Sequence, residues 1–252
     1  MAKYGIIEFG NDDKHLGKGL GPWYMDGETA IGGFLNTRLM KSCFKKILDA
    51  YGMESKMKGI VNHSAIINKD SFPSFFDLYQ NCCDILEVSN RPKVFACPDL
   101  MGINAISLQV GDEPVIMCSL QSTILLSAPE ARFLLGHELG HCQQGNLIAH
   151  SVDFLLDAVR DKSEILGSII SDSILVPLKR WSKQSEFNAD RAGYLCCKDI
   201  DAIKSLFGRI HDPRLRTKYN DLAELYQSHP FVKTRIQKVK EFAQSVGNLK
   251  VE

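Results

Sequence analysis

The sequence predicts an α+β fold that is mostly helical and contains a small antiparallel sheet. Two features support this prediction. Three short strand-like segments, separated by turn-forming residues, lie in the first half of the chain, at Lys93–Cys97, Asn104–Val110 and Pro114–Leu120. The segments that follow them have the apolar periodicity of helices. With 252 residues, 44% of them hydrophobic, the chain is long enough to bury a substantial core.

Residues 1–70 are predicted to form an N-terminal extension of unknown role. Frequent glycines make its first part rich in turns, without a clear period. A helix is expected at Leu35–Tyr51. The main domain is predicted at residues 71–252, and it begins with a helix after Ser71-Phe72-Pro73 whose apolar face belongs to the core.

A helix with clear end signals is predicted after the third strand segment. Ser127 and Glu130 have the spacing of a capping box, and Pro129 is acceptable in a first turn. Gly145 provides a stop, because glycine readily adopts the left-handed conformation that follows a helix end. The sequence therefore predicts a helix from about Ser127 to Gly145.

This helix carries the pattern H-E-x-x-H, formed by His137, Glu138 and His141. On a helix, a spacing of four residues places both imidazoles on one face, one turn apart, where they can reach a single metal ion. Glu138 then lies close to the open side of the metal, where it can take a proton from water. The alternative is a pair of structural histidines with an incidental glutamate, and the end signals of the helix weaken it.

A catalytic zinc site needs a third protein ligand, and Glu186 is the best candidate. Glu186 and Asp190 lie one turn apart on a helix predicted from about Trp181 to Lys198. One carboxylate can bind the metal while the other accepts a hydrogen bond from a ligand imidazole. A lone glutamate is more often a solvated surface residue, but the small residues around this one predict a closely packed helix.

The segment between these two helices, residues 146–183, is apolar but is interrupted by charged residues. No run in it approaches the roughly twenty apolar residues that a membrane-spanning helix needs. The spacing predicts two amphipathic helices instead, the second ending at Pro177. Three further helices are expected after the Glu186 helix, at residues 199–207, 212–227 and 230–246.

Composition narrows the classes of partner and the cellular location. The 30 basic residues balance the 30 acidic residues and are dispersed, which predicts no nucleic-acid partner. The first residues lack the apolar core and cleavage site of an export signal, which predicts a cytoplasmic protein. The eight cysteines are therefore expected to be reduced, and their spacing does not match that of zinc ribbons.

With these motifs in this order, the sequence resembles a family of zinc metallopeptidases that includes the heat-shock protease HtpX and the CAAX prenyl proteases. The resemblance implies a gluzincin, a zincin-like domain whose single zinc ion is held by two histidines and a glutamate. The chain resembles a member without transmembrane segments, although many relatives are integral membrane proteins. The matching segments are the H-E-x-x-H helix, Glu186–Gly193, Asn104-Ala105, and His229-Pro230 followed by Arg235-Ile236.

The resemblance also implies roles for residues outside the metal helix. Asn104 and Ala105 would begin an edge strand that pairs with the extended substrate peptide. His229 and Arg235 would stabilise the negative charge that develops on the substrate carbonyl. Without the resemblance, a lone histidine such as His229 is as often a helix cap or a surface residue.

These observations predict a zinc-dependent endopeptidase that hydrolyses extended polypeptide with a metal-activated water and with Glu138 as general base. The expected substrate is a peptide or an unfolded protein, and manganese or cobalt could replace zinc. Two alternatives stay open. One is a zinc-binding regulatory or protein-binding module without turnover, and the other is a latent protease whose N-terminal extension covers the cleft.

Overall fold

The computed structural model describes Tyr24 and residues 37–50, 52–111, 113–145, 147, 172–210 and 232–248. Most of the turn-rich first part, most of the predicted amphipathic helices of residues 146–183 and the predicted helix at 212–227 lie outside these residues. The described helices are α2 (Arg38–Ala50), α3 (Met53–Asn62), α4 (Pro73–Ile85), α5 (Leu120–Leu125), α6 (Ala128–Gln144), α9 (Asp172–Cys197), α10 (Ile200–Ile210) and α11 (Val232–Asn248). The described strands are β1 (Ala65–Ile66), β2 (Lys93–Cys97), β3 (Ala105–Val110) and β4 (Glu113–Ser119).

These elements confirm the predicted α+β class, but the sheet is mixed and not antiparallel. Its strand order is β1-β2-β4-β3. The chain turns back through Gly111, which has a left-handed φ of 64°, so that β4 runs antiparallel to β3. β4 lies between β3 and β2, and it runs parallel to β2. The prediction of a purely antiparallel sheet was therefore wrong for this one pair.

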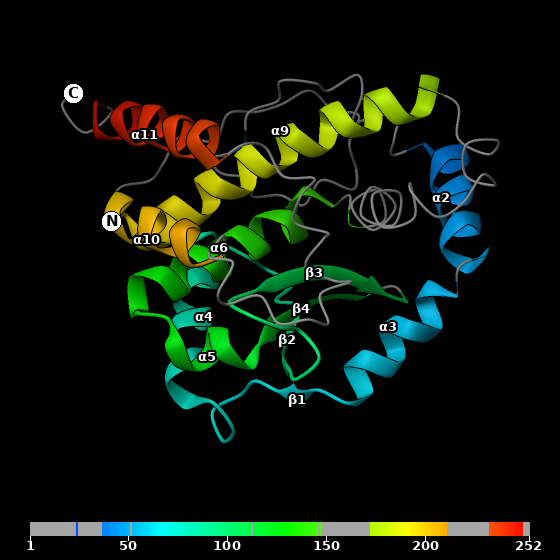
Figure 1. The fold of residues 1–252 in the computed structure, drawn as a ribbon, viewed down its shortest axis with the longest axis horizontal. Helices are drawn as coiled ribbons and strands as arrows, with labels where there is room; N and C mark the ends of the chain where they lie inside the picture. Colours follow the sequence, from blue (N-terminus) through cyan, green and yellow to red (C-terminus); the bar gives the residue numbers. More distant parts are fainter. Residues whose placement is uncertain are drawn as a thin grey trace.

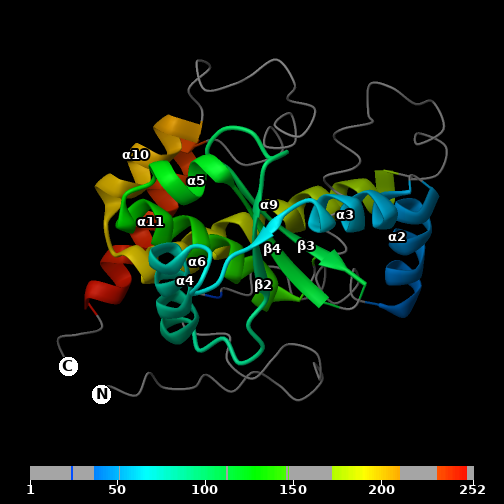
Figure 2. The ribbon, with the colours of Figure 1, turned by 90° about the horizontal axis from the view of Figure 1, so that it is seen from below.

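The sheet separates two layers of helices. In Figure 1, α6 and α9 lie above the sheet, and β3 is the strand nearest to them. Seen from below in Figure 2, α3 lies in front of the sheet and α9 behind it. The main core joins the sheet to α4, α6, α9, α10 and α11, and a second cluster packs Met57 of α3 against Leu108 and Val115. The seven cysteines with described side chains are free thiols, as expected.

The boundary predicted at residue 70 stays a prediction. Two elements that precede it pack on the sheet. Ile66 of β1 pairs with Phe95 of β2, and Met57 of α3 is buried against the strands. A truncated chain beginning at Ser71 would therefore lose part of the sheet and of its second core cluster.

Helix α6 begins and ends where the sequence predicts. The Ser127 backbone N–H donates to Glu130 Oε2 at 2.8 Å, which completes the capping box. Glu130 also binds Arg209 of α10 at 2.9 Å, so the start of α6 is tied to a second helix. At the other end, Gly145 has a left-handed φ of 72°. The predicted helix is confirmed.

Helix α9 is longer than the sequence predicts. It runs from Asp172 to Cys197 and continues through Pro177, so the predicted helix end at that proline was wrong. Proline removes one backbone donor and usually ends or bends a helix, but it does not end α9 here. Neither α9 nor any other described helix is long and apolar enough to cross a membrane.

Small residues allow α6 and α9 to approach closely. A Cβ atom placed on Gly140 would lie 3.0 Å from Cα of Ala189, and one on Gly193 would lie 2.7 Å from the backbone oxygen of Phe133. Both distances are shorter than ordinary van der Waals contact. The absence of side chains at these two glycines therefore allows the two helices to bring their polar side chains together.

We expect Gly193→Ala to destabilise the protein by about 1–3 kcal/mol, because the new methyl group would collide with rigid backbone. Gly208→Ala is the matched control, because a Cβ on Gly208 in α10 meets nothing within 4 Å. Alanine favours helices, so this control should gain up to about 1 kcal/mol. Urea unfolding of both variants and the parent measures the difference. A Gly193→Ala protein as stable as the Gly208→Ala protein would contradict the close approach of α6 and α9.

Candidate metal centre

The two histidines of the H-E-x-x-H pattern lie one turn apart on α6 and are buried. Their ring centroids are 4.6 Å apart and their planes are perpendicular. The Nε2 atoms of His137 and His141 are 3.1 Å apart. The helix therefore brings one nitrogen of each imidazole to the same point.

Glu186 of α9 reaches that point from the opposite helix. Its Oε1 lies 3.2 Å from Nε2 of His141, and its Oε2 lies 3.6 Å from Nε2 of His137. One ligand atom from each of the three residues lies within 4.8 Å of the others, and all three side chains are buried. The structure thus brings together the three side chains predicted as metal ligands.

Asp190 holds the far side of His137. Its Oδ1 lies 3.1 Å from Nδ1 of His137, and the aspartate is fully buried. Burial opposes ionisation of Asp190, but Arg235 outweighs it and lowers the pKa of the carboxyl below its usual value. The aspartate is therefore an anion that accepts the Nδ1 proton of His137, which leaves the Nε2 lone pair facing the other ligands.

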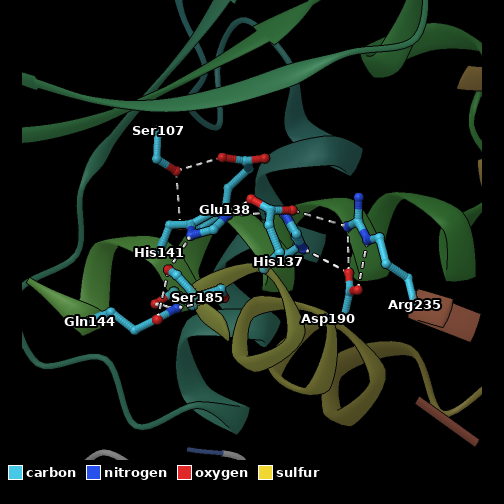
Figure 3. Close-up of polar contacts among 10 residues, drawn as sticks. Ser107, His137, Glu138, His141, Gln144, Ser185, Asp190 and Arg235 are labelled. Carbon is cyan, nitrogen blue, oxygen red and sulfur yellow. Dashed lines mark hydrogen bonds and ion pairs between the residues drawn. The ribbon is translucent and has the colours of Figure 1, made fainter. Parts of the chain in front are cut away.

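Ser185 and Gln144 hold the far side of His141 in a similar way. The Ser185 hydroxyl donates to Oε1 of Gln144 at 2.8 Å. Its oxygen lies 3.4 Å from Nδ1 of His141 and can accept the proton of that nitrogen. Nε2 of Gln144 donates in turn to the backbone oxygens of Ser185 and Gly140. Figure 3 shows this pair below His141, with Asp190 and Arg235 on the other side of the two imidazoles.

This arrangement of donors fits a cation. Both Nδ1 atoms face acceptors, so both Nε2 atoms present lone pairs to each other at 3.1 Å. Two lone pairs and a carboxylate at this distance repel one another unless a proton or a metal ion lies between them. Burial alone would lower the pKa of His141, but Glu186 raises it above its usual value, as expected for a site that attracts positive charge. The ligand set of two histidines and one glutamate matches that of catalytic zinc sites.

Glu138 lies beside this cluster and is also buried. Its carboxylate reaches toward the sheet, where Oε2 accepts a hydrogen bond of 2.6 Å from the Ser107 hydroxyl of β3. Figure 3 shows the Glu138 carboxylate on the sheet side of the two imidazoles. A second acid is thus next to the ligand cluster without belonging to it, as a general base requires.

Two residues, His229 and Arg235, are predicted to stabilise the oxyanion, and the structure describes one of them. His229 lies outside the described residues. Arg235 is buried in α11 and binds Asp190 with two nitrogens, Nε at 2.7 Å and Nη2 at 2.6 Å. Its Nη2 also lies 3.5 Å from Oε2 of Glu186, and its guanidinium lies over the Phe207 ring. The oxyanion role of both residues stays a prediction.

The predicted substrate strand lies at the edge of the sheet. Ala105 begins β3, the last strand in the sheet order, and pairs with Cys118 on one side. Asn104 precedes it and is anchored to α5, because its backbone N–H and oxygen both bond the Ser122 hydroxyl, at 2.8 and 2.9 Å. β3 is thus an edge strand of the described sheet, and the role of Asn104 and Ala105 in binding a substrate stays a prediction.

The sequence analysis did not identify Ser107, Ser185 or Gln144. Ser107 follows Ala105 at the two-residue spacing of a strand, so a polar residue on the helix-facing side was visible as a signal. Ser185 directly precedes Glu186, and Gln144 lies near the end of α6. Their contacts depend on how α6, α9 and β3 cross one another, which no local pattern specifies.

Comparison with known proteins agrees with this geometry. One curated relative is the plastoglobule-localized metallopeptidase 48 of Arabidopsis thaliana chloroplasts, which is 24% identical over 178 residues. The alignment covers 69% of this chain and 51% of the relative, so it spans about half the length of that protein. No solved structure matches the chain.

The model of a peptidase family matches more than half of the chain. It covers residues 111–243, which include the H-E-x-x-H helix, Glu186, Asp190 and Arg235. This match confirms the resemblance to zinc metallopeptidases, and the family implies a metal cofactor and a peptide or protein substrate. The chain belongs to peptidase family M48.

Proposed function

We propose that this chain is a zinc-dependent endopeptidase that hydrolyses peptide bonds of extended polypeptide, with Glu138 as the general base. The observation that carries the proposal is the buried convergence of His137, His141 and Glu186, with one ligand atom from each within 4.8 Å. A structural zinc site is usually closed by four protein ligands, whereas a catalytic site has three and an open position. The described residues supply three ligands and an adjacent acid.

The proposed roles follow from the chemistry of each side chain. A zinc ion bound by the three ligands would lower the pKa of a water molecule to near neutrality and polarise the scissile carbonyl. Glu138 takes a proton from the attacking water and then gives it to the leaving amine. Asp190 and Ser185 keep the Nδ1 protons of the two histidines directed away from the metal site.

The proposed binding position of the substrate peptide is the edge strand β3. Its outer edge has no strand partner in the described sheet, and such an edge can add an extended peptide through main-chain hydrogen bonds. The peptide would thus lie along Asn104 and Ala105, on the same strand that contacts Glu138 through Ser107. His229 and Arg235 are proposed to stabilise the developing oxyanion. The cytoplasmic location also stays a proposal, because the Arabidopsis relative is named for plastoglobules.

Metal analysis and hydrolysis of unfolded casein test the function. The purified full-length chain is expected to contain about one zinc ion and to cleave casein, since the described ligand cluster is suited to one ion. Removal of the ion with 1,10-phenanthroline should abolish cleavage, and added Zn²⁺ should restore it. Hydrolysis that persists in metal-free protein would refute the proposal, and bound zinc without hydrolysis would favour the binding-module alternative.

A further inference from the structure

Ser107 is a polar residue on a face of the sheet that is otherwise part of the core. It is the third residue of β3 and is paired with Ile116, which is fully buried. Strand alternation places Ser107 on the same face as Ala105, toward α6. Only 7% of the residue's surface is exposed to solvent. A buried hydroxyl is costly unless it is hydrogen-bonded, so its partners identify its role.

Two acceptors of the Ser107 hydroxyl belong to Glu138, and the Cys142 thiol is a further hydrogen-bonding neighbour. The oxygen lies 2.6 Å from carboxylate Oε2 and 2.9 Å from the backbone oxygen of the same residue. A hydroxyl has one proton, and the shorter contact to an ionised carboxylate is the stronger of the two. The backbone oxygen can share this proton only as the weaker acceptor. Ser107 thus joins the substrate-edge strand to the proposed general base.

The contact restricts a side chain that is otherwise flexible. A glutamate carboxylate can rotate about several single bonds, and proton transfer requires it within about 3 Å of the water it activates. A hydrogen bond to Oε2 holds one carboxylate oxygen toward the strand, and the second oxygen is then available for proton transfer. Glu138 itself is 4% exposed, so bulk solvent has little access to its carboxylate.

We propose that Ser107 is a positioning residue that holds the Glu138 carboxylate in its catalytic orientation from the edge strand. This inference rests on the proposed peptidase function and extends it to a residue of the sheet. Ser107 does not touch the ligand side chains in any described contact. Its effect is therefore expected on turnover and not on metal binding.

The first test is the kinetics of Ser107→Ala with a fluorogenic peptide that the parent protein cleaves. We expect kcat to fall about 10–100-fold, as for other residues that orient a catalytic group, with KM and zinc content within twofold of the parent. A purely structural role would instead change zinc content or KM together with kcat. Ser245→Ala is the control, since Ser245 donates to a backbone oxygen of its own helix, α11, at 2.7 Å. It should match the parent in every readout.

The second test measures the contact without using activity. Urea unfolding is compared for the parent, Ser107→Ala, Glu138→Ala and the double variant. If the hydroxyl binds the carboxylate, the two substitutions will be non-additive by about tenfold in the unfolding equilibrium constant. Additive effects would overturn the inference, even if Ser107→Ala lowers activity.

The outcomes separate this inference from the proposed function. A parent protein that cleaves peptide, with Ser107→Ala cleaving at the same kcat, leaves the peptidase proposal intact and rejects the role of Ser107. A metal-loaded parent that cleaves nothing rejects both. Lower kcat with unchanged KM and zinc content, together with non-additive unfolding, supports the positioning role.

Discussion

Glu138→Gln is expected to lower kcat for peptide hydrolysis by about 10²–10⁴-fold, the range that general acid–base catalysis contributes. Glutamine has nearly the same shape but cannot take a proton from water. Its amide oxygen can still accept the hydrogen bond from Ser107, so the local structure should be kept. Glu138 is outside the ligand cluster, so zinc content should equal that of the parent.

The measurement pairs steady-state kinetics with metal analysis of the same preparations. Glu241→Gln is a suitable control, because Glu241 lies on the exposed part of α11 and its ion pair with Lys238 is a surface pair. This control should retain parental kcat. Glu138→Gln turnover at the parental rate would show that another group is the base. Loss of zinc from Glu138→Gln would show that Glu138 supports the metal site directly.

The sequence predicts α6 well because its signals are local. A capping box at Ser127, a proline in the first turn and Gly145 after the last turn act over a few residues each. The spacing of His137 and His141 then determines their relative placement, since both lie on one rigid helix. Helix ends and side chains on a single element can therefore be predicted without knowledge of the tertiary fold.

The pairing of β2 with β4 could not be predicted in this way. Strand periodicity shows which segments are strands, but it does not show that β4 inserts between β2 and β3. The continuation of α9 through Pro177 was missed for a different reason, because the local rule that proline ends a helix was treated as absolute. The first error concerns long-range pairing, and the second concerns a local rule that has exceptions.

The candidate site also contains some residues that local patterns predict and others that depend on the tertiary fold. The candidate ligands His137, His141 and Glu186 could be predicted because the chemistry of zinc restricts residue type and spacing. The residues that orient them come from wherever the fold supplies a hydrogen-bond partner. Ser107 comes from a strand and Ser185 from a facing helix, and each is one serine among many in the sequence. Small residues at Gly140 and Gly193 were visible, but their meaning depended on the helix that faces them.

Asp190→Ala is expected to destabilise the protein by about 3–5 kcal/mol, the cost of removing one partner from a buried ion pair. Asp190 is fully buried and binds Arg235 with both carboxylate oxygens. Without it, the buried guanidinium of Arg235 loses its two short hydrogen bonds and keeps the longer contact to Glu186, at 3.5 Å. The Nδ1 proton of His137 also loses its acceptor, so zinc affinity should fall about 10–100-fold.

Urea unfolding of metal-free protein and zinc titration of the folded variant measure these two effects separately. Lys238→Ala is the control for a surface pair on the same helix as Arg235, and it should cost less than about 1 kcal/mol. Adding Arg235→Met to Asp190→Ala should recover part of the lost stability, because the buried guanidinium that lost its main partner is then also removed. It should not recover zinc affinity, since His137 still lacks its acceptor. If the double variant regained both properties, the aspartate would act only by neutralising Arg235 and not by orienting the histidine.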